Sequence, residues 1–371
     1  MDTTVNKPPD KEEISRRRVP CLATYLQPFR LVDATSLEPW NASIEQINNR
    51  TWDYSALHEI AGGIDVGLDA PYHLVVARDG AIALPPIPEL CSDQAIVEFF
   101  NHTLSALLLG GLYCEAISVD GLDMGSILDW KYVRSHRYGK AASNRFHEQI
   151  RYGKASPLEA IQLYQPRTVK LELLQEAMRL GLGVLKRIDE LKGEYLLRGV
   201  TGIARRDWGS ALANLWIVVE QLTSHLWKRE IVRPTIAQDK TASRRAQLSD
   251  TRTWTASARL EMLFQKEALN LPTFRFLSDA RKARNDLSHE GKLPSEYSAM
   301  NAYSGVCGLL LVVLNEERPA LLDLNLADHA LSDPFAPRGP IEGEPQFWMA
   351  IPKLPGEQEL ELAEAALRNQ K

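Results

Sequence analysis

Apolar positions divide the chain into a mixed first part and a helical second part. Between residues 168 and 318, apolar side chains recur every three to four residues, as they do along one face of a helix. This spacing predicts helices over residues 168–191, 205–229, 254–269, 273–290 and 295–317. Helices joined by short links form a helical bundle.

Two features inside the helical part affect this picture. The segment 205–229 is apolar on most of its surface, so we expect it to be buried, and Glu220 lies within its apolar run. A buried carboxylate needs a partner. The polar segment from Thr235 to Asp250 predicts a loop between two helices, a flexible lip near a cleft.

The earlier part of the chain shows both strand and helix patterns. Apolar runs over 72–77 and 81–84 flank Arg78-Asp79-Gly80, and Asp-Gly between apolar runs predicts a β-hairpin. Residues 93–109 have the pattern of an amphipathic helix that ends at Gly110, and residues 112–119 predict a strand. The fold class expected for the whole chain is therefore α+β.

Basic residues gather in the segment that follows. They are Lys131, Arg134, His136, Arg137, Lys140, Arg145 and His147. The cluster predicts a basic surface loop, and a second contact with a polyanion is the alternative.

Two prolines between Ser156 and Arg167 indicate a domain boundary. We expect a mobile arm over 1–23, an α+β module over 24–165, a helical bundle over 166–320 and an acidic, proline-containing tail over 321–371. A length of 371 residues accommodates two domains with such extensions.

Composition is that of an ordinary globular protein, with 44% hydrophobic and 25% charged residues. The four cysteines are scattered and form no C-x-x-C pair, which fits a reducing cytoplasm. The first residues lack the apolar core of a signal peptide. The most apolar run, 306–314, is shorter than the roughly 20 residues that span a bilayer, so no membrane association is expected.

Charge is distributed unevenly along the chain. The net charge is −5, yet residues 201–292 hold 16 basic and 10 acidic residues, whereas residues 315–371 hold 5 basic and 11 acidic residues. A basic middle can meet a polyanion. An ordinary solvated helical surface gives the same balance, so charge alone leaves both interpretations open.

The stretch 279–292 places a fixed cation and a titratable ring five positions apart. The guanidinium of Arg284 suits phosphate oxygens, and the imidazole of His289 exchanges a proton near neutral pH. Five residues advance about 500° around a helix, so the two side chains converge only if the helix ends or bends near His289. Gly291 is a helix stop signal. A solvated helix end also gives this spacing.

With Asn285, this motif resembles the signature of the HEPN family: an arginine, often followed by a polar residue, and a histidine a few positions further on. The resemblance covers residues 168–318, with the motif late in the domain before one last apolar helix. HEPN domains are small helical domains of prokaryotic toxins and antiviral proteins. A larger region in front of such a domain is similar to the Apea-like abortive-infection group.

The resemblance implies a metal-independent endoribonuclease without a cofactor. His289 would act as general acid or base, Arg284 would stabilise charge on the phosphorus oxygens, and Asn285 would position phosphate or histidine. Glu220 would face and orient Arg284, with a salt bridge in the core as the equal alternative, and Asp286 would support the site. The RNA-binding residues would be Arg281, Lys282, Arg244 and Arg245.

The resemblance also implies partners. The chain would bind RNA and form a homodimer through the HEPN domain, with two motifs facing each other across a shared cleft. Residues 24–165 would sense a phage or cellular trigger. Two alternatives stay open: a non-catalytic HEPN module that binds nucleotide, RNA or an antitoxin, and a helical scaffold in which Arg284 and His289 merely end a helix.

Overall fold

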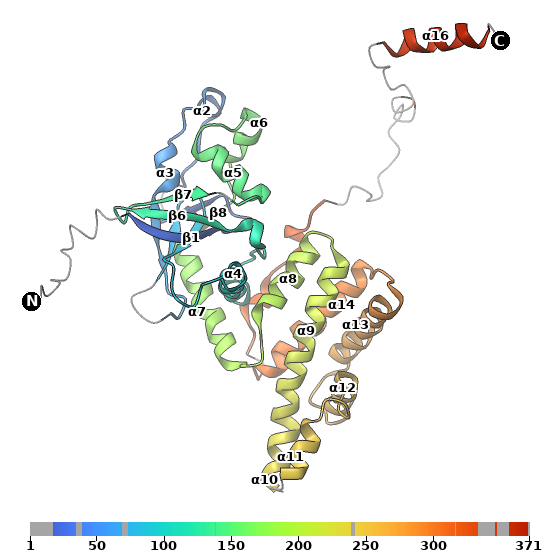
Figure 1. The fold of residues 1–371 in the computed structure, drawn as a ribbon. Coiled ribbons are helices and arrows are strands. Elements are labelled where there is room, and N and C mark those ends of the chain that lie inside the picture. The colour runs from blue at the N-terminus through green and yellow to red at the C-terminus, as the bar shows by residue number, and fades with distance from the viewer. Residues whose placement is uncertain are drawn as a thin grey trace, which may run out of the picture. The chain divides into compact units, whose positions relative to one another are not determined.

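The computed structural model describes residues 18–34, 39–68, 73–137, 139–238, 242–315, 317–332, 346 and 356–369. Contacts divide the chain into one compact unit over residues 1–330 and a second unit over residues 331–371. The larger unit combines a curled antiparallel sheet with a set of helices (Figure 1). The predicted α+β class is therefore confirmed.

In the described chain, one sheet contains six strands in the spatial order β3-β4-β5-β1-β6-β7, and all neighbouring strands are antiparallel. The strands are β1 (Val19–Tyr25), β3 (Ile60–Ile64), β4 (Leu74–Ala77), β5 (Ala81–Leu84), β6 (Asp123–Leu128) and β7 (Tyr132–Arg137). Strands β4 and β5 confirm the predicted hairpin, and Gly80 in its turn has φ +81°, which glycine adopts without strain. Residue 72 of the hairpin pattern, like residues 1–17 of the arm, lies outside the described residues, whereas residues 19–23 belong to β1.

A small helical lobe covers one side of this sheet (Figure 1). Its helices are α2 (Ile44–Asn49), α3 (Tyr54–His58), α5 (Ala142–Arg151) and α6 (Pro157–Ala160). They enclose a separate apolar cluster in which Trp52, Leu57 and Ile150 are buried. The parallel pair β2 (Leu31–Asp33) and β8 (Thr168–Lys170) connects this region with the start of the bundle.

Helix α4 (Asp93–Leu109) forms where the sequence predicts it. The side chain of Ser92 accepts a hydrogen bond from the Ala95 amide and begins the helix, and Gly110 ends it. Its apolar face is wide: Phe100 and Leu104 are fully buried.

The predicted strand over 112–119 is wrong, because residues 112–118 pair with no other strand in the described chain. The backbone amides of this segment donate hydrogen bonds to side chains instead. The amide of Ala116 donates to Thr201 Oγ1 at 2.8 Å, and the amide of Ile117 donates to Asn101 Oδ1 at 2.9 Å. These partners lie far away in sequence, so local pattern does not reveal them.

The bundle surrounds helix α9 (Trp208–Trp227), which packs against four neighbours (Figure 1). These neighbours are α8 (Gly193–Ala204), α12 (Ala256–Gln265), α13 (Leu271–Glu290) and α14 (Glu296–Val313). Helix α7 (Leu171–Arg187) leads into the bundle. The predicted helices are found within a few residues of their expected ends, and α8 fills a segment to which the sequence pattern assigned no element.

The predicted loop over 235–250 is wrong. After α9, a π-helical turn (Lys228–Val232) continues into α10 (Arg233–Gln238), and α11 (Ala242–Ser249) follows. The indole of Trp227 donates to the Leu248 carbonyl at 2.9 Å and contacts the ring of Trp254. This contact gives the polar segment an apolar surface on which to fold.

Helices α4 and α7 join the sheet part to the bundle by a very close contact. A Cβ atom at Gly181 would overlap the carbonyl oxygen of Ala106, and one at Gly110 would overlap the carbonyl oxygen of Ala177. Only glycine permits backbones to approach this closely. One continuous apolar cluster therefore runs from the sheet through α4 and α7 to α14.

The chain after α14 returns to this core before it reaches the second unit. Short 3₁₀ turns at Ala320–Asp323 and Leu326–His329 bury Leu321 and Leu326. Residues 321–330, assigned by the sequence pattern to the tail, thus pack in the larger unit. The second unit contains helix α16 (Glu357–Arg368), whose residues are all exposed.

No helix within the described ranges is long and apolar enough to cross a membrane.

The α4–α7 contact predicts opposite effects for two glycines on one helix. Gly181→Ala should lower the free energy of unfolding by about 3 kcal/mol, because the new methyl group overlaps a backbone carbonyl. Gly183→Ala should raise it by up to ~1 kcal/mol, because a Cβ there meets no atom within 4 Å and alanine favours the helix. Urea denaturation of both variants measures the difference; equal stability of the two would contradict the close contact.

Candidate functional site

Helix α13 places the predicted motif at its exposed C-terminal end. The side chain of Asn270 accepts a hydrogen bond from the Thr273 amide at 2.9 Å and begins the helix. Gly291, at φ +66°, ends it, and its amide donates to the Leu287 carbonyl at 3.2 Å. The predicted stop signal is therefore confirmed.

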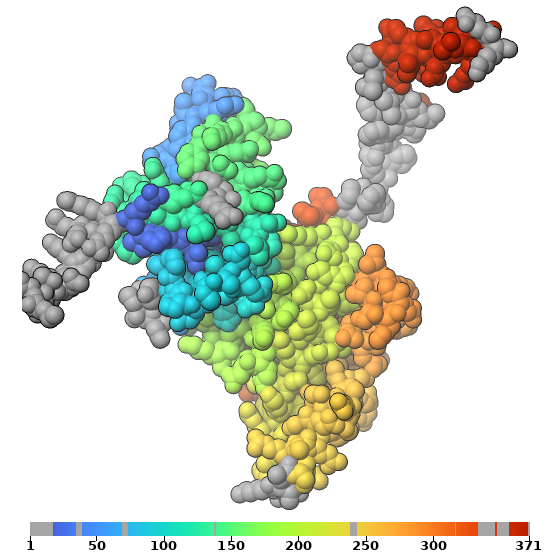
Figure 2. Space-filling view, in the orientation of Figure 1, coloured from blue at the N-terminus to red at the C-terminus, as the bar shows by residue number. Residues whose placement is uncertain are grey.

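Solvent reaches the motif. His289 and Asn285 are exposed, and Arg284 is half-buried. One weak hydrogen bond, at 3.4 Å, joins the Arg284 guanidinium to Asn285 Oδ1. Neither an ion pair of Arg284 nor a hydrogen bond of the His289 ring is found among the described residues. Both groups are thus available to an external phosphate. Figure 2 shows the surface around the end of α13 and the start of α14, in orange.

Within one chain, the helix keeps Arg284 and His289 apart. Helix α13 is continuous from Leu271 to Glu290, so the helix ends only after both residues. At about 100° per residue, their side chains point roughly 140° apart around the axis. The predicted helix end near His289 is present, at Glu290, but it lies beyond both residues, so it does not turn their side chains toward each other.

The prediction that Glu220 is buried is wrong, and no ion pair between Glu220 and Arg284 is found among the described residues. Glu220 is exposed on α9, and its carboxylate accepts a hydrogen bond from the Trp216 indole at 2.7 Å. Ala213, two turns earlier on the same face, is exposed too, while Val219 and Leu222 take the buried positions. The run is apolar in sequence, but the helical period turns the face that carries Glu220 toward solvent.

The remaining predicted residues fall into two groups. On α13, Lys282 is exposed, Asp286 is half-buried, and Arg281 donates a hydrogen bond to the Ser257 hydroxyl of α12. On α11, Arg244 and Arg245 are both exposed. Helix α11 lies at the tip of the bundle, beyond α12 (Figure 1). The structure therefore brings the α13 residues together and leaves the α11 arginines at a second place on the bundle.

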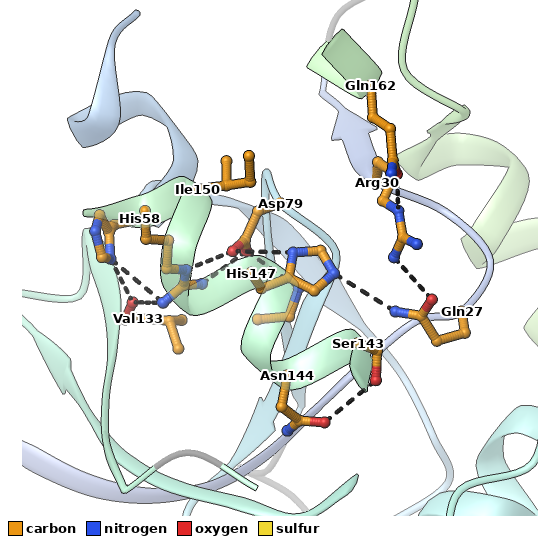
Figure 3. A network of polar contacts seen from close by, with 12 residues as sticks. Gln27, Arg30, His58, Asp79, Val133, Ser143, Asn144, His147, Ile150 and Gln162 are labelled. Carbon is orange, nitrogen blue, oxygen red and sulfur yellow. Dashed lines mark hydrogen bonds and ion pairs between the residues drawn. The ribbon is translucent and has the colours of Figure 1, made fainter. Parts of the chain in front are cut away.

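A buried polar network in the sheet part was missed (Figure 3). Arg151 on α5 forms a two-pronged ion pair with Asp79 in the β4–β5 turn, with Nη2 to Oδ1 at 2.7 Å, and also donates to the Val133 carbonyl at 3.0 Å. His147 Nδ1 lies 3.8 Å from Asp79 Oδ2, and its ring stacks on Tyr25 at 3.9 Å.

The predicted basic surface is found for Lys131, Arg134, His136, Lys140 and Arg145, which are exposed, but these residues lie on a strand, a link and a helix rather than in one loop, and His147 is buried. Residues 131–147 supply β7 and most of α5, and both His147 and Arg151 are almost completely buried. The sequence signal that could have revealed this burial is the spacing of four residues between His147 and Arg151, which places both on one face of a helix in an otherwise polar segment. No substrate reaches side chains buried in this way, so the network holds the lobe against the sheet.

Electrostatics keep this network in one protonation state. Burial alone would raise the pKa of Asp79, but the charge and hydrogen bonds of Arg151 outweigh it and hold that pKa below its ordinary value. Burial also lowers the pKa of His147 to about 3, against the opposing attraction of Asp79. The carboxylate is therefore charged and the imidazole neutral near pH 7.

Among the described residues, no group of three or more histidine, cysteine, aspartate or glutamate side chains lies in a position to hold a metal ion.

Comparison with family models, with curated proteins and with solved structures finds no match for this chain. The resemblance to HEPN domains therefore stays a prediction from the motif and the helix pattern.

The buried imidazole predicts a loss of stability in mild acid. In the unfolded chain the pKa of histidine is about 6.5, and in the folded chain that of His147 is about 3. Between these values only the unfolded chain binds the proton. The free energy of unfolding should then fall, by up to ~1.4 kcal/mol per pH unit, as the pH decreases from 6.5.

His147→Phe keeps a ring to stack on Tyr25 and removes the titration. Its stability should decline less steeply than that of the wild type between pH 6.5 and pH 4, as measured by urea denaturation at each pH. If the free energy of unfolding falls equally steeply with decreasing pH in both proteins, folding does not lower the pKa of His147 and the prediction is wrong.

Proposed function

We propose that the chain is a metal-independent endoribonuclease of the HEPN type. The observation that carries this proposal is the exposed position of Arg284, Asn285 and His289 at the end of α13, without competing ion pairs in the described chain. An unpaired guanidinium and an accessible imidazole are the two groups that cleavage of a phosphodiester requires without a metal.

The reaction uses the 2′-hydroxyl of RNA as the nucleophile. One imidazole removes the hydroxyl proton while the oxygen attacks phosphorus, and an acid protonates the leaving 5′-oxygen. The guanidinium of Arg284 stabilises the negative charge that develops on the phosphorus oxygens. Asn285, next to it on the helix, positions the phosphate.

A second copy of the chain completes the site. Because Arg284 and His289 diverge by roughly 140° on one helix, the imidazole of one protomer and the guanidinium of the other are the pair that meets one phosphate. Leu293 and Tyr297, just beyond the motif, are 79% and 68% exposed and supply apolar surface for such a contact. This arrangement requires a homodimer through the α13–α14 face.

The RNA strand follows basic residues outside the motif. Lys282 is exposed on α13 two residues before Arg284, and Arg244 and Arg245 extend the basic surface toward the tip of the bundle. Arg281 contributes less directly, because its guanidinium already bonds Ser257. Asp286 supports the site from the half-buried side of α13.

In the cell, the chain acts in the cytoplasm as the effector of a toxin or an antiviral abortive-infection response. The sheet part, over residues 24–165, senses a phage or cellular trigger. The continuous core between this part and the bundle supports the proposal, because a change on the sheet side can reach α9 and α13 through packed helices.

One observation favours a second candidate, a non-catalytic HEPN module that binds nucleotide or RNA, or that pairs with an antitoxin. Binding needs only the exposed cations of α13 and α11, whereas catalysis needs the motif to converge. Because Arg284 and His289 are separated in one chain, a single chain meets the requirement for binding but not the requirement for catalysis.

The proposal predicts that Arg284→Ala and His289→Ala each reduce RNA cleavage by at least about a hundredfold, the usual effect of losing an acid–base or charge-stabilising group. Arg275→Ala is the matched control: Arg275 is exposed on the same helix, about two and a half turns before Arg284, and should retain activity. Circular dichroism checks that all variants are folded.

Activity should persist in EDTA. Binding of RNA without cleavage by the wild type, and the same weak binding in the variants, would support the non-catalytic module and contradict the nuclease. Wild-type cleavage by the Arg284→Ala, His289→Ala double variant would discard the mechanism altogether.

A further inference from the structure

One face of the six-stranded sheet is covered only in part by the described chain. On β1 and β5 this face packs against α4, because Leu22 and Ile82 belong to the same apolar cluster as Phe100. Met124 of β6 pairs with Leu22 and so lies on the same face, yet it is 54% exposed. We call the open part of this surface the β6–β7 face; it consists of Arg18, Met124, Ser126, Arg134 and His136.

The β6–β7 face is basic. Ser126 on β6 pairs with Arg134 on β7, and directly paired residues point to the same side of a sheet. The guanidinium of Arg18 donates a hydrogen bond to the Ser126 hydroxyl at 2.9 Å. A second hydrogen bond, at 2.7 Å, joins this hydroxyl to the ring of His136. Two arginines and a histidine therefore lie close to one serine.

The positive charges of this face are not compensated. Arg18 and Arg134 are exposed, and neither forms an ion pair with a described residue. Of the nearby carboxylates, Glu59 pairs with two other cations, and Asp129 in the β6–β7 turn pairs with neither arginine. Partial burial and the charges of Arg18 and Arg134 lower the pKa of His136 below its ordinary value. The field at this face is thus positive, and an anion is the ligand that it favours.

The turn between β6 and β7 presents an aromatic side chain from an unfavourable backbone position. Asp129 and Trp130 both have positive φ, 50° and 51°, and the Lys131 amide donates to the Leu128 carbonyl at 2.9 Å. Turns with two positive φ angles prefer Asn-Gly or Asp-Gly, because a bulky residue is strained there. Trp130 occupies the second position and is 46% exposed. Strained residues of this kind are concentrated at ligand sites.

We propose that the β6–β7 face binds single-stranded nucleic acid, with phosphates at Arg18 and Arg134 and a base stacked on Trp130. Uncompensated cations beside an exposed aromatic ring are the combination that such strands need, because guanidinium groups hold the phosphates and the ring holds a base. A duplex fits less well, since its bases are stacked on one another. This inference does not rest on the nuclease proposal, because none of these residues belongs to the α13 motif.

Fluorescence anisotropy with short labelled strands tests the proposal. The parent protein is the full chain with Arg284→Ala and His289→Ala, so that the α13 motif cannot cleave the strand. We expect a Kd of about 10 µM or lower at moderate salt. RNA and DNA strands of one sequence distinguish the two sources of this chemistry: binding of either supports the proposal, and the tighter strand identifies the natural class.

Arg18→Gln with Arg134→Gln, the face pair, removes both proposed phosphate contacts. The affinity should fall at least about tenfold, because two charge-assisted hydrogen bonds are lost. The slope of log K against log salt concentration should become less steep by roughly 1.4, about 0.7 for each phosphate. Arg145→Gln with Lys154→Gln is the matched control pair: both residues are exposed on the helical lobe, outside the face, and the net charge changes equally. This pair should retain the affinity of the parent.

Trp130→Gly separates base stacking from folding. Glycine adopts a positive φ without strain, so the hairpin should be retained, as thermal unfolding followed by circular dichroism would show. The affinity should nevertheless fall about fivefold or more, the usual effect of removing one contact between a base and an aromatic ring. A duplex of the same sequence should bind the parent more weakly than the single strand does.

A loss of affinity in the face pair and in Trp130→Gly, with the control pair unchanged, establishes the site. Equal losses in the face pair and the control pair would mean that net charge alone attracts the strand, and this overturns the proposal. Unchanged affinity of Trp130→Gly also overturns it, because no base then stacks on that ring. Binding of the parent to phosphatidylserine vesicles but to neither strand overturns it as well and identifies the face as a membrane-binding surface.

Discussion

The backbone contact between α4 and α7 is the constraint on which the rest of the structure depends. At Gly110 and Gly181 the two helices approach so closely that no side chain fits between them. Helix α4 also covers the sheet, and α7 leads into the bundle, so this contact fuses two regions into one core.

The same core determines what the candidate site can do. Helix α9 holds α13 and α14 in place, and the motif projects from the exposed end of α13. A rigid helix positions Arg284 and His289 reproducibly, but its period also keeps them apart. In the proposed nuclease, one chain would therefore supply two separate halves of the phosphodiester site. The buried Asp79–Arg151 pair, by contrast, has complete geometry and no access, so it stabilises the fold.

Sequence pattern predicts those elements whose signals are local. Ser92 and Gly110 bound α4, Gly291 ends α13, and an Asp-Gly turn forms the β4–β5 hairpin, as their residue types indicate. Failures occur where a distant partner decides the outcome. Thr201 and Asn101 satisfy the backbone of the predicted strand over 112–118, and Trp227 supports the helix in place of the predicted loop.

For the candidate site, sequence alone identified the motif residues and the helix end but not their surroundings. The apolar run of α9 suggested a buried Glu220, whereas the helical period turns this residue to solvent. Most of the basic cluster is exposed, as its residue types predict, whereas His147 is buried beside Asp79, some 70 residues earlier in the chain. Charge compensation between distant residues leaves no local pattern.

The central functional claim is that two chains build one site, because one helix cannot bring its own guanidinium and imidazole together. The molar mass of the protein in solution, measured by light scattering at the concentration at which RNA is cleaved, tests this claim directly. A dimer has about twice the chain mass of 41.7 kDa, and this is the mass that we expect for the cleaving species. A cleaving species of 41.7 kDa would contradict it.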